Sequence, residues 1–281
     1  MGSPRETKKV TRVISGALLL LGVIAALWFL APIYLVGIAL VVALLAFREY
    51  LDIAARAGVQ VSKPAGATSV ALACVAVGIP GMPVEAALSG TTLGLSALAL
   101  SRALTRGTSA VETNGALSTA AIAAFAPLYI GVPIGLIAAT RWTAGREAAL
   151  LLILTVATSD TFQYYSGRLF GRRLLAPVVS PKKTIEGAIG GFVGAALVLG
   201  VVGAWWLPQM GIVTRIVLGL AVAAAGIMGD LFESLLKRSV SLKDASAVIP
   251  GHGGVLDRID ALLFAAPVFY VFVRYSFWAG R

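Results

Sequence analysis

The residues from Val13 to Phe47 form one apolar run that contains no charged side chain. A helix needs roughly 20 apolar residues to cross the hydrocarbon core of a bilayer, so this run is too long for a single crossing. Pro32 lies near its middle, and proline cannot continue a helix without losing a hydrogen bond. The run therefore predicts two membrane helices joined by a turn near Pro32.

The rest of the chain has the composition of a membrane protein. Hydrophobic residues make up 58% of the 281 residues and charged residues only 13%, whereas soluble domains contain about 25% charged residues. We therefore expect an all-α, polytopic integral membrane protein with about nine transmembrane helices. The third to ninth spans are predicted at residues 67–87, 90–105, 117–139, 147–166, 185–206, 212–236 and 259–278.

The distribution of basic residues predicts the orientation of these spans. With nine spans and a cytoplasmic N-terminus, eighteen of the 23 lysines and arginines lie on the cytoplasmic side, as the positive-inside rule requires. The expected location is the cell inner (plasma) membrane, with a cytoplasmic site. The net charge of +10 favours anionic membrane lipids and anionic substrates as partners, and no soluble basic domain is present to bind nucleic acid.

Acidic residues divide the chain by function. Seven of the thirteen lie after residue 158, so we divide the chain into N-terminal membrane helices (1–116), middle membrane helices (117–158) and a catalytic membrane region (159–281). Five fall between residues 230 and 260, namely Asp230, Glu233, Asp244, Asp257 and Asp260. Carboxylates that meet between two helices need cations, and Mg²⁺ binds through carboxylates and substrate phosphates. The alternative is a set of structural ion pairs with Lys237, Arg238, Lys243 and Arg258.

Between these acids lies a glycine-rich turn, residues 250–254. Gly251, Gly253 and Gly254 permit a positive φ and a close approach of the backbone to a ligand. His252 is the only histidine of the chain. It could take part in catalysis or hold the loop through a hydrogen bond, and the sequence leaves both open.

A second polar segment, Ser180-Pro181-Lys182-Lys183-Thr184, precedes a helix that we expect to begin near Ile185. Exposed amides at a helix start favour anions, and the two lysines add positive charge suited to phosphates. The Gly-x4-Gly-Lys-Ser/Thr pattern of a P-loop is absent. Asp160 and Glu186 flank the segment, either as ligands of a metal or substrate or as partners of nearby basic residues.

These motifs resemble the phosphatidate cytidylyltransferases, also called CDP-diacylglycerol synthases. The resemblance covers residues 159–262 and lies in Ser234-x-x-Lys237-Arg238, Lys243-Asp244, Ile249-Pro250-Gly251-His252-Gly253-Gly254 and Asp257-Arg258-x-Asp260. The segments DTxxxYxxGRxFG and SPKKTxEGxxGG match as well. Gln163, Ser246 and Ala261 depart from the usual family residues.

The resemblance implies the reaction of CTP with phosphatidic acid to give CDP-diacylglycerol and pyrophosphate, with Mg²⁺, alone or paired with K⁺, and a homodimer. By resemblance, Asp230, Asp257 and Asp260 hold the cation and act in catalysis with Lys237 and Arg258. Ser180, Lys182, Lys183 and Thr184 would contact the CTP phosphates. Further substrate contacts are expected from Arg238, Lys243, Asp244, His252, Gly253, Gly254, Asp160 and Glu186. Lys182 or Lys183 should then lie within one nucleotide's length of Asp257.

A lipid kinase and a cation transporter are the two alternative functions. A CTP-dependent kinase of a polyprenol-type lipid would need a base for the acceptor hydroxyl and should lack the complete HGG-x-x-DR-x-D signature, which is present. A cation transporter would place its carboxylates near the midplane of broken helices, whereas Asp257 and Asp260 adjoin a loop rich in basic residues. The cytidylyl transfer is therefore the favoured interpretation.

Overall fold

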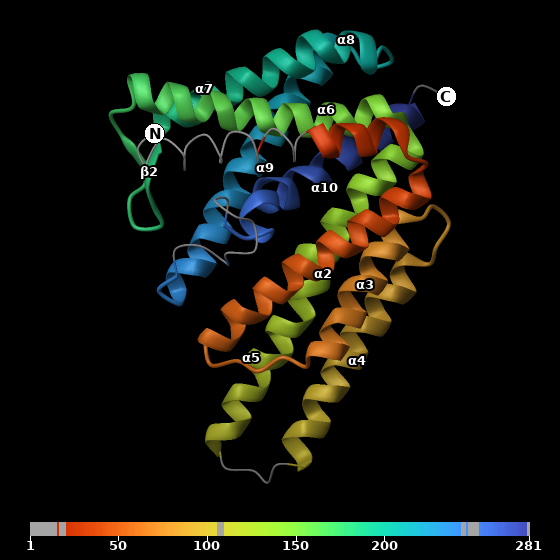
Figure 1. Cartoon of the computed structure of the whole chain (residues 1–281), viewed down its shortest axis with the longest axis vertical. Helices are drawn as coiled ribbons and strands as arrows, with labels where there is room; N and C mark the ends of the chain where they lie inside the picture. Colours follow the sequence, from red (N-terminus) through yellow and green to blue (C-terminus); the bar gives the residue numbers. More distant parts are fainter. Residues whose placement is uncertain (1–15, 17–20, 106–109, 243–245, 247–252, 280–281) are drawn as a thin grey trace, which may run out of the picture.

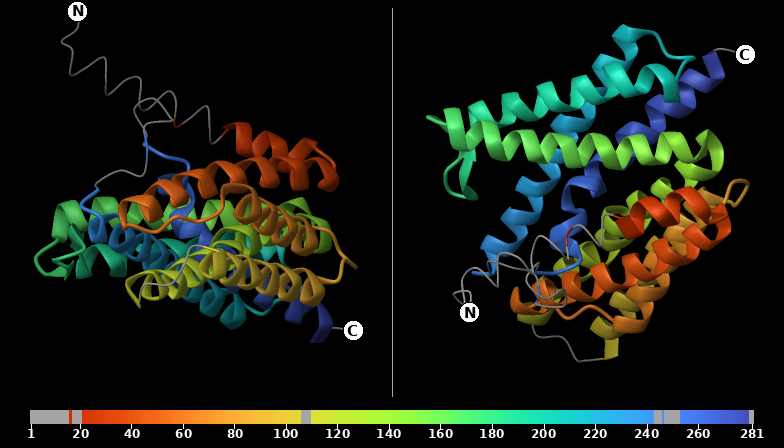
Figure 2. Two further views of the ribbon diagram at one scale, coloured as in Figure 1. Left: turned by 90° about the horizontal axis from the view of Figure 1, so that it is seen from below. Right: turned by 45° about the horizontal axis from the view of Figure 1, so that its top comes forward.

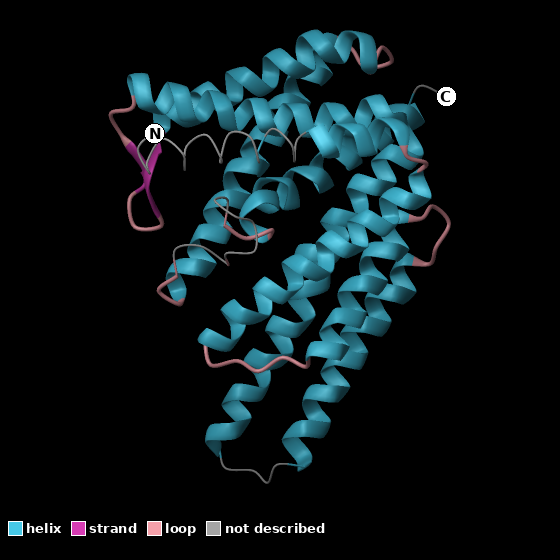
Figure 3. Ribbon diagram, in the orientation of Figure 1, coloured by secondary structure: helices cyan, strands magenta, loops and turns pink. Residues whose placement is uncertain are grey.

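The computed structural model describes residues 16, 21–105, 110–242, 246 and 253–279. These residues are helical apart from short connections and one two-stranded hairpin (Figure 3), as the all-α prediction requires. The longer helices are α2 (Pro32–Arg56), α3 (Lys63–Gly78), α4 (Val84–Thr105), α5 (Ala110–Ala126), α6 (Val132–Phe170), α7 (Ile185–Leu197), α9 (Ile212–Ser239) and α10 (Leu256–Ala279). Two single π-helical turns, η1 (Pro127–Gly131) and η2 (Val198–Val202), and the short α8 (Gly203–Trp206) complete the helical elements.

Four helical segments in the described part of the chain are long and apolar enough to cross a membrane. They are Pro32–Arg56, Leu117–Phe170, Ile185–Trp206 and Ile212–Ser239. The class of helical membrane protein is thus confirmed, while the number of nine crossings and their orientation stay predictions.

The first helix break lies where the sequence predicts it. Residues 21–29 are helical, and α2 begins at Pro32 after a two-residue break. Helix α2 continues through the charged stretch that follows, as far as Arg56, and buries Glu49. Helix α5 begins at Ala110.

Helix α6 is bent at Gly145, whose φ of 92° no other residue type adopts easily. The bend separates the two spans predicted at 117–139 and 147–166. Its second arm runs beside α7 at the top of Figure 1. The two helices can approach closely because Gly190 and Gly191 have no β-carbon. A β-carbon at Gly190 would overlap Ser166, and one at Gly191 would overlap Gln163. The glycines of the SPKKTxEGxxGG segment thus serve helix packing.

Helix α10 runs beside α9 (Figure 2) and contributes residues to two hydrophobic clusters. Its residues Leu256 and Leu263 pack into the cluster formed with α2, α3 and η1. Ala265 and Phe269 pack into the cluster formed with α6, α9 and the end of the α7–α8 segment. The helix therefore joins the N-terminal helices to the region that holds the signature motifs.

The hairpin consists of β1 (Leu174–Ala176) and β2 (Ser180–Thr184), which pair antiparallel between α6 and α7. Strand β2 is the segment Ser180-Pro181-Lys182-Lys183-Thr184, expected to precede a helix, and α7 begins at Ile185 as predicted. The hairpin brings this segment to the same end of the molecule as the last turns of α9 (Figure 1).

Candidate active site

A buried ion-pair group connects α9 to the start of α10. Lys237 Nζ lies 2.6 Å from Glu233 Oε2 and donates a hydrogen bond of 2.6 Å to Asp257 Oδ1. The side chain of Glu233 is almost fully buried, and those of Lys237 and Asp257 are largely so. Buried charges of this kind are stable only when paired and hydrogen-bonded. Lys237 thus forms ion pairs with both Glu233 and Asp257.

The backbone before α10 is shaped around Asp257. Gly253 has a φ of 79°, the left-handed conformation that the glycine-rich turn predicts. The amide of Gly254 donates to Asp257 Oδ2 over 2.8 Å, so this carboxylate binds both α9 and its own helix start. One turn later, Asp260 Oδ1 accepts a hydrogen bond of 2.7 Å from the amide of Ala261.

The hairpin meets the carboxylates through one ion pair. Lys183 Nζ lies 2.6 Å from Asp230 Oδ2, and both side chains are partly exposed. Ser234, one turn along α9, donates to Asp230 Oδ1 over 3.4 Å. Lys182, the neighbouring residue of β2, is exposed. The segment expected to contact phosphates thus lies against Asp230 of α9, while the expected proximity of Lys182 or Lys183 to Asp257 stays a prediction.

The start of α7 is held by two local contacts. Thr184 is the N-cap residue, and its Oγ1 accepts from the amide of Gly187 over 3.1 Å. Glu186 Oε2 accepts from the amides of Arg172 (3.0 Å) and Arg173 (3.2 Å). Glu186 therefore ties the entry of the hairpin to α7, a supporting contact rather than one aimed at the acidic cluster.

Three carboxylates from three helices interact electrostatically. Asp160 of α6 and Asp260 of α10 each interact with Asp230 of α9, and Asp260 also interacts with Asp160. Lys183 and Arg258 supply the opposing charge near Asp160. Gln163, the residue that departs from the family pattern, lies with its Nε2 3.2 Å from Asp160 Oδ1 and so orients this carboxylate.

The described residues include no group of three acidic, histidine or cysteine side chains arranged to hold a metal ion. The donor types nevertheless suit a hard divalent cation, which takes carboxylate oxygens. Asp257 keeps acceptor capacity beyond its bonds to Lys237 and Gly254, because each carboxylate oxygen has two lone pairs. The assignment of Asp230, Asp257 and Asp260 to a cation stays a prediction.

The remaining predicted residues lie at the ends of α9 and α10 or outside the described residues. Arg238 is exposed and donates to the carbonyl of Leu242 over 3.2 Å, a bond that links the last turn of α9 to the residues that follow it. Arg258 is exposed and interacts with Asp160. Lys243, Asp244 and His252 lie outside the described residues.

Sequence analysis missed Glu49, which lies far from the signature motifs. Only 2% of its surface is exposed. Glu49 Oε1 accepts from Ser246 Oγ (2.6 Å) and from the amide of Val255 (2.9 Å), and Oε2 accepts from the amide of Leu256 (2.7 Å). The only signal for a buried role in the sequence is a charged residue at the end of an apolar run. Such a residue is equally typical of the interface between membrane and water.

A second missed residue is Tyr129, in the π-helical turn η1. Its hydroxyl is buried and has no hydrogen-bond partner among the described residues. The ring packs against Phe232 of α9 and Phe264 of α10, and the residue interacts electrostatically with Glu233 and Asp260. Pro127, which the sequence marks as a break, begins this turn.

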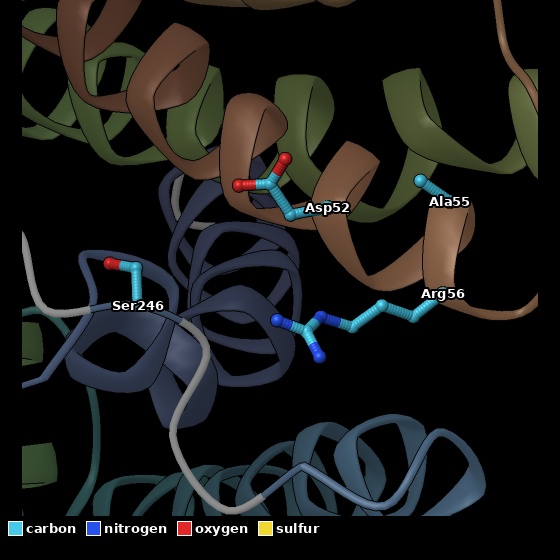
Figure 4. Close-up of a pocket in the computed structure, with 4 residues that line it drawn as sticks. All are labelled: Asp52, Ala55, Arg56 and Ser246. Carbon is cyan, nitrogen blue, oxygen red and sulfur yellow. The ribbon is translucent and has the colours of Figure 1, made fainter.

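A cavity of about 550 Å³ opens between α2 and Ser246. Asp52, Ala55, Arg56 and Ser246 line it. Figure 4 shows the side chain of Arg56 extending from the last turn of α2 toward the side on which Ser246 lies. The cavity therefore offers a basic group at the end of a membrane helix.

The sequence matches the model of the Cytidylyltransferase family from residue 10 to residue 276. The chain belongs to this family. The family resemblance inferred from the signature motifs is thus confirmed.

Similar proteins include the phosphatidate cytidylyltransferase of Synechocystis sp., 43% identical over 131 residues, which are 46% of this chain and 44% of that protein. That of Aquifex aeolicus is 45% identical over 122 residues, 43% of this chain and 45% of that protein. The Escherichia coli protein YnbB, named as uncharacterized, is 38% identical over 136 residues, 48% of this chain and 45% of that protein. The chain spans about half the length of the curated relatives it matches.

Proposed function

We propose that the protein transfers a cytidylyl group from CTP to phosphatidic acid, giving CDP-diacylglycerol and pyrophosphate for phospholipid synthesis. Membership of the Cytidylyltransferase family and the names of two relatives support this reaction. The contact between Lys183 and Asp230 is the observation that carries the proposal. It places a lysine suited to phosphates beside carboxylates suited to a cation, which is the combination that nucleotidyl transfer needs.

In this reaction a phosphate oxygen of phosphatidic acid bonds to the α-phosphorus of CTP. The bond from that phosphorus to the bridging oxygen breaks, and pyrophosphate leaves with the electron pair. The attacking oxygen is already anionic, so no strong base is needed. Positioning and neutralisation of charge are therefore the main tasks. Ser180, Lys182, Lys183 and Thr184 bind the phosphates of CTP at the hairpin and the α7 start, and Arg258 meets phosphate beside Asp160.

The carboxylates have a separate role in the proposal. Asp230, Asp257 and Asp260 would hold Mg²⁺, alone or with K⁺, and Asp160 would support them. When bound, the cation neutralises charge on the α-phosphate and on the departing pyrophosphate. Lys237 keeps Asp257 oriented from the α9 side.

The proposed setting is the inner (plasma) membrane, with the site at its cytoplasmic face and the protein as a homodimer. The support for the cytoplasmic face is the bias of lysine and arginine between the two sides of the expected spans.

Two labels distinguish cytidylyl transfer from the kinase reaction. Purified protein in detergent is given CTP labelled with ³²P at either the α- or the γ-phosphate, with phosphatidic acid or a polyprenol as acceptor. Cytidylyl transfer moves only the α-label to lipid and only with phosphatidic acid. A kinase would move the γ-label to the polyprenol, and that result would overturn the proposal.

The same assay tests the cation. Chelation should abolish lipid labelling, and added Mg²⁺ should restore it. Asp230→Asn and Asp260→Asn should each lower the rate by at least about a hundredfold, because charge stabilisation at the reacting phosphate is lost. Glu85→Gln, an exposed change in α4, should leave the rate unchanged. Full activity in both aspartate variants would refute the assignment.

A further inference from the structure

The carboxylate of Glu49 binds the first turn of α10. The amides of Val255 and Leu256 point at it over 2.9 Å and 2.7 Å, and Ser246 adds a hydroxyl donor at 2.6 Å. Gly254 packs directly against the carboxylate, where a β-carbon would overlap it. Glu49 thus has three donors, and a neighbour small enough to let it approach the backbone.

The donors of this contact suit a carboxylate acceptor. The amides at a helix start have no partner within the helix, and the helix dipole adds positive charge there. A carboxylate that accepts from backbone amides forms charge-assisted hydrogen bonds, roughly twice as strong as neutral ones. The contact therefore fixes the direction of the first turn of α10 against α2.

That turn begins the segment that holds two of the residues proposed to bind the cation. Asp257 follows Leu256 directly, and its own carboxylate accepts from Gly254 and from Lys237. Asp260 lies one turn further and interacts with Asp230 and Asp160. Glu49, on α2, and Asp257, which is bonded to α9, thus both accept hydrogen bonds from the backbone at the start of α10.

We propose that Glu49 is a positioning residue for the cytidylyl transfer. It holds the first turn of α10 so that Asp257 and Asp260 face Asp230 and the hairpin. Glu49 itself touches neither substrate nor cation. The inference rests on the proposed function, since it assigns the residue a place in that reaction.

Glu49→Gln tests the proposal with little change of shape. The amide group keeps one acceptor oxygen, but its NH₂ must face the backbone N–H of either Val255 or Leu256, so at least one bond is lost. Glu85→Gln is the matched control, because Glu85 is exposed and lies in the first turn of α4, far along the chain from the signature motifs. The full chain is studied in detergent with CTP, phosphatidic acid and Mg²⁺.

Two measurements are made on each variant. Hydrogen–deuterium exchange of the peptide 253–260 should be faster in Glu49→Gln and unchanged in Glu85→Gln. The kcat for CDP-diacylglycerol should fall by about tenfold to a hundredfold in Glu49→Gln, as a small misplacement of reacting groups predicts. KM for both substrates should stay within about twofold, because Glu49 contributes no binding contact.

Unchanged kcat in Glu49→Gln overturns the proposal, whatever the exchange data show. A rise in KM at constant kcat also overturns it, since Glu49 would then bind substrate. If Glu49→Gln fails to fold, Ser246→Ala tests the proposal in its place, because it removes one of the three hydrogen-bond donors to Glu49. Faster exchange at 253–260 with a kcat lowered by about twofold to fivefold supports the proposal, and wild-type values of both refute it.

Failure of the proposed function would look different. The wild-type protein would then form no CDP-diacylglycerol, while the exchange of 253–260 would still report whether Glu49 holds the turn. A failure of the positioning role appears only in the comparison of active wild type with its variants.

Discussion

Replacing Lys237 with methionine should destabilise the protein more than any other single lysine substitution near the site. Its ammonium group lies 2.6 Å from both Glu233 Oε2 and Asp257 Oδ1. Methionine keeps much of the side-chain volume and removes the charge. Two buried carboxylates would then face each other without a cation.

The magnitude follows from the burial of the three groups. Exposed fractions of the side chains are 11% for Lys237, 1% for Glu233 and 7% for Asp257, so water screens them little. Breaking a buried pair by removing one partner reduces the free energy of unfolding by about 3–5 kcal/mol. At about 1.4 kcal/mol per factor of ten, the unfolded-to-folded ratio should rise at least about a hundredfold.

Equilibrium unfolding in mixed micelles, with increasing sodium dodecyl sulfate, measures this change. Lys182→Met is the control, and it should stay within about 0.5 kcal/mol of wild type because its side chain is exposed. The double variant Lys237→Met/Glu233→Gln should lose less than the sum of the single variants, since it leaves one carboxylate where two would repel. A loss below about 1 kcal/mol in Lys237→Met, or strict additivity, would refute the reasoning.

Two further predictions concern packing and capping. Gly229→Ala should lower the free energy of unfolding by about 1–3 kcal/mol, because its β-carbon would overlap the carbonyl of Asp260. Gly226→Ala, one turn earlier and with its nearest neighbour at 3.7 Å, should be neutral or stabilising. Equal effects of the two substitutions in the same unfolding assay would contradict this prediction. Thr184→Ala should lower the free energy of unfolding by about 1 kcal/mol through loss of the α7 N-cap, and Thr184→Ser should keep most of that stability. Thermal unfolding in which the serine variant is as unstable as the alanine variant would disprove the capping role.

The parts of the fold predicted correctly depend on local signals. The break before Pro32 follows from the missing N–H of proline, and the start of α7 follows from Thr184 beside a run of small apolar residues. The positive φ of Gly253 follows from its place in a glycine-rich turn. Each signal is contained within a few neighbouring residues.

The features that the sequence does not predict depend on contacts between residues that are far apart in the chain. The stretch from Arg48 to Arg56 contains good helix formers, but nothing near Glu49 in the sequence shows what its carboxylate contacts. Its partner Leu256 is 207 residues away. The pairing of Lys183 with Asp230, rather than with the nearer Glu186, likewise depends on how the hairpin packs on α9. Tertiary packing decides such contacts, and a single sequence does not reveal them.

The contact between Glu49 and the start of α10 also bears on how the protein is made. Helix α2 leaves the ribosome long before α10, so Glu49 enters the membrane without the amides that later surround it. A carboxylate in that position is costly within a bilayer, and pairing over such a separation closes slowly. Until α10 is synthesised, the carboxylate of Glu49 lacks the backbone donors that it has in the finished protein. Completion of α10 supplies these donors, so this contact forms only in the finished molecule.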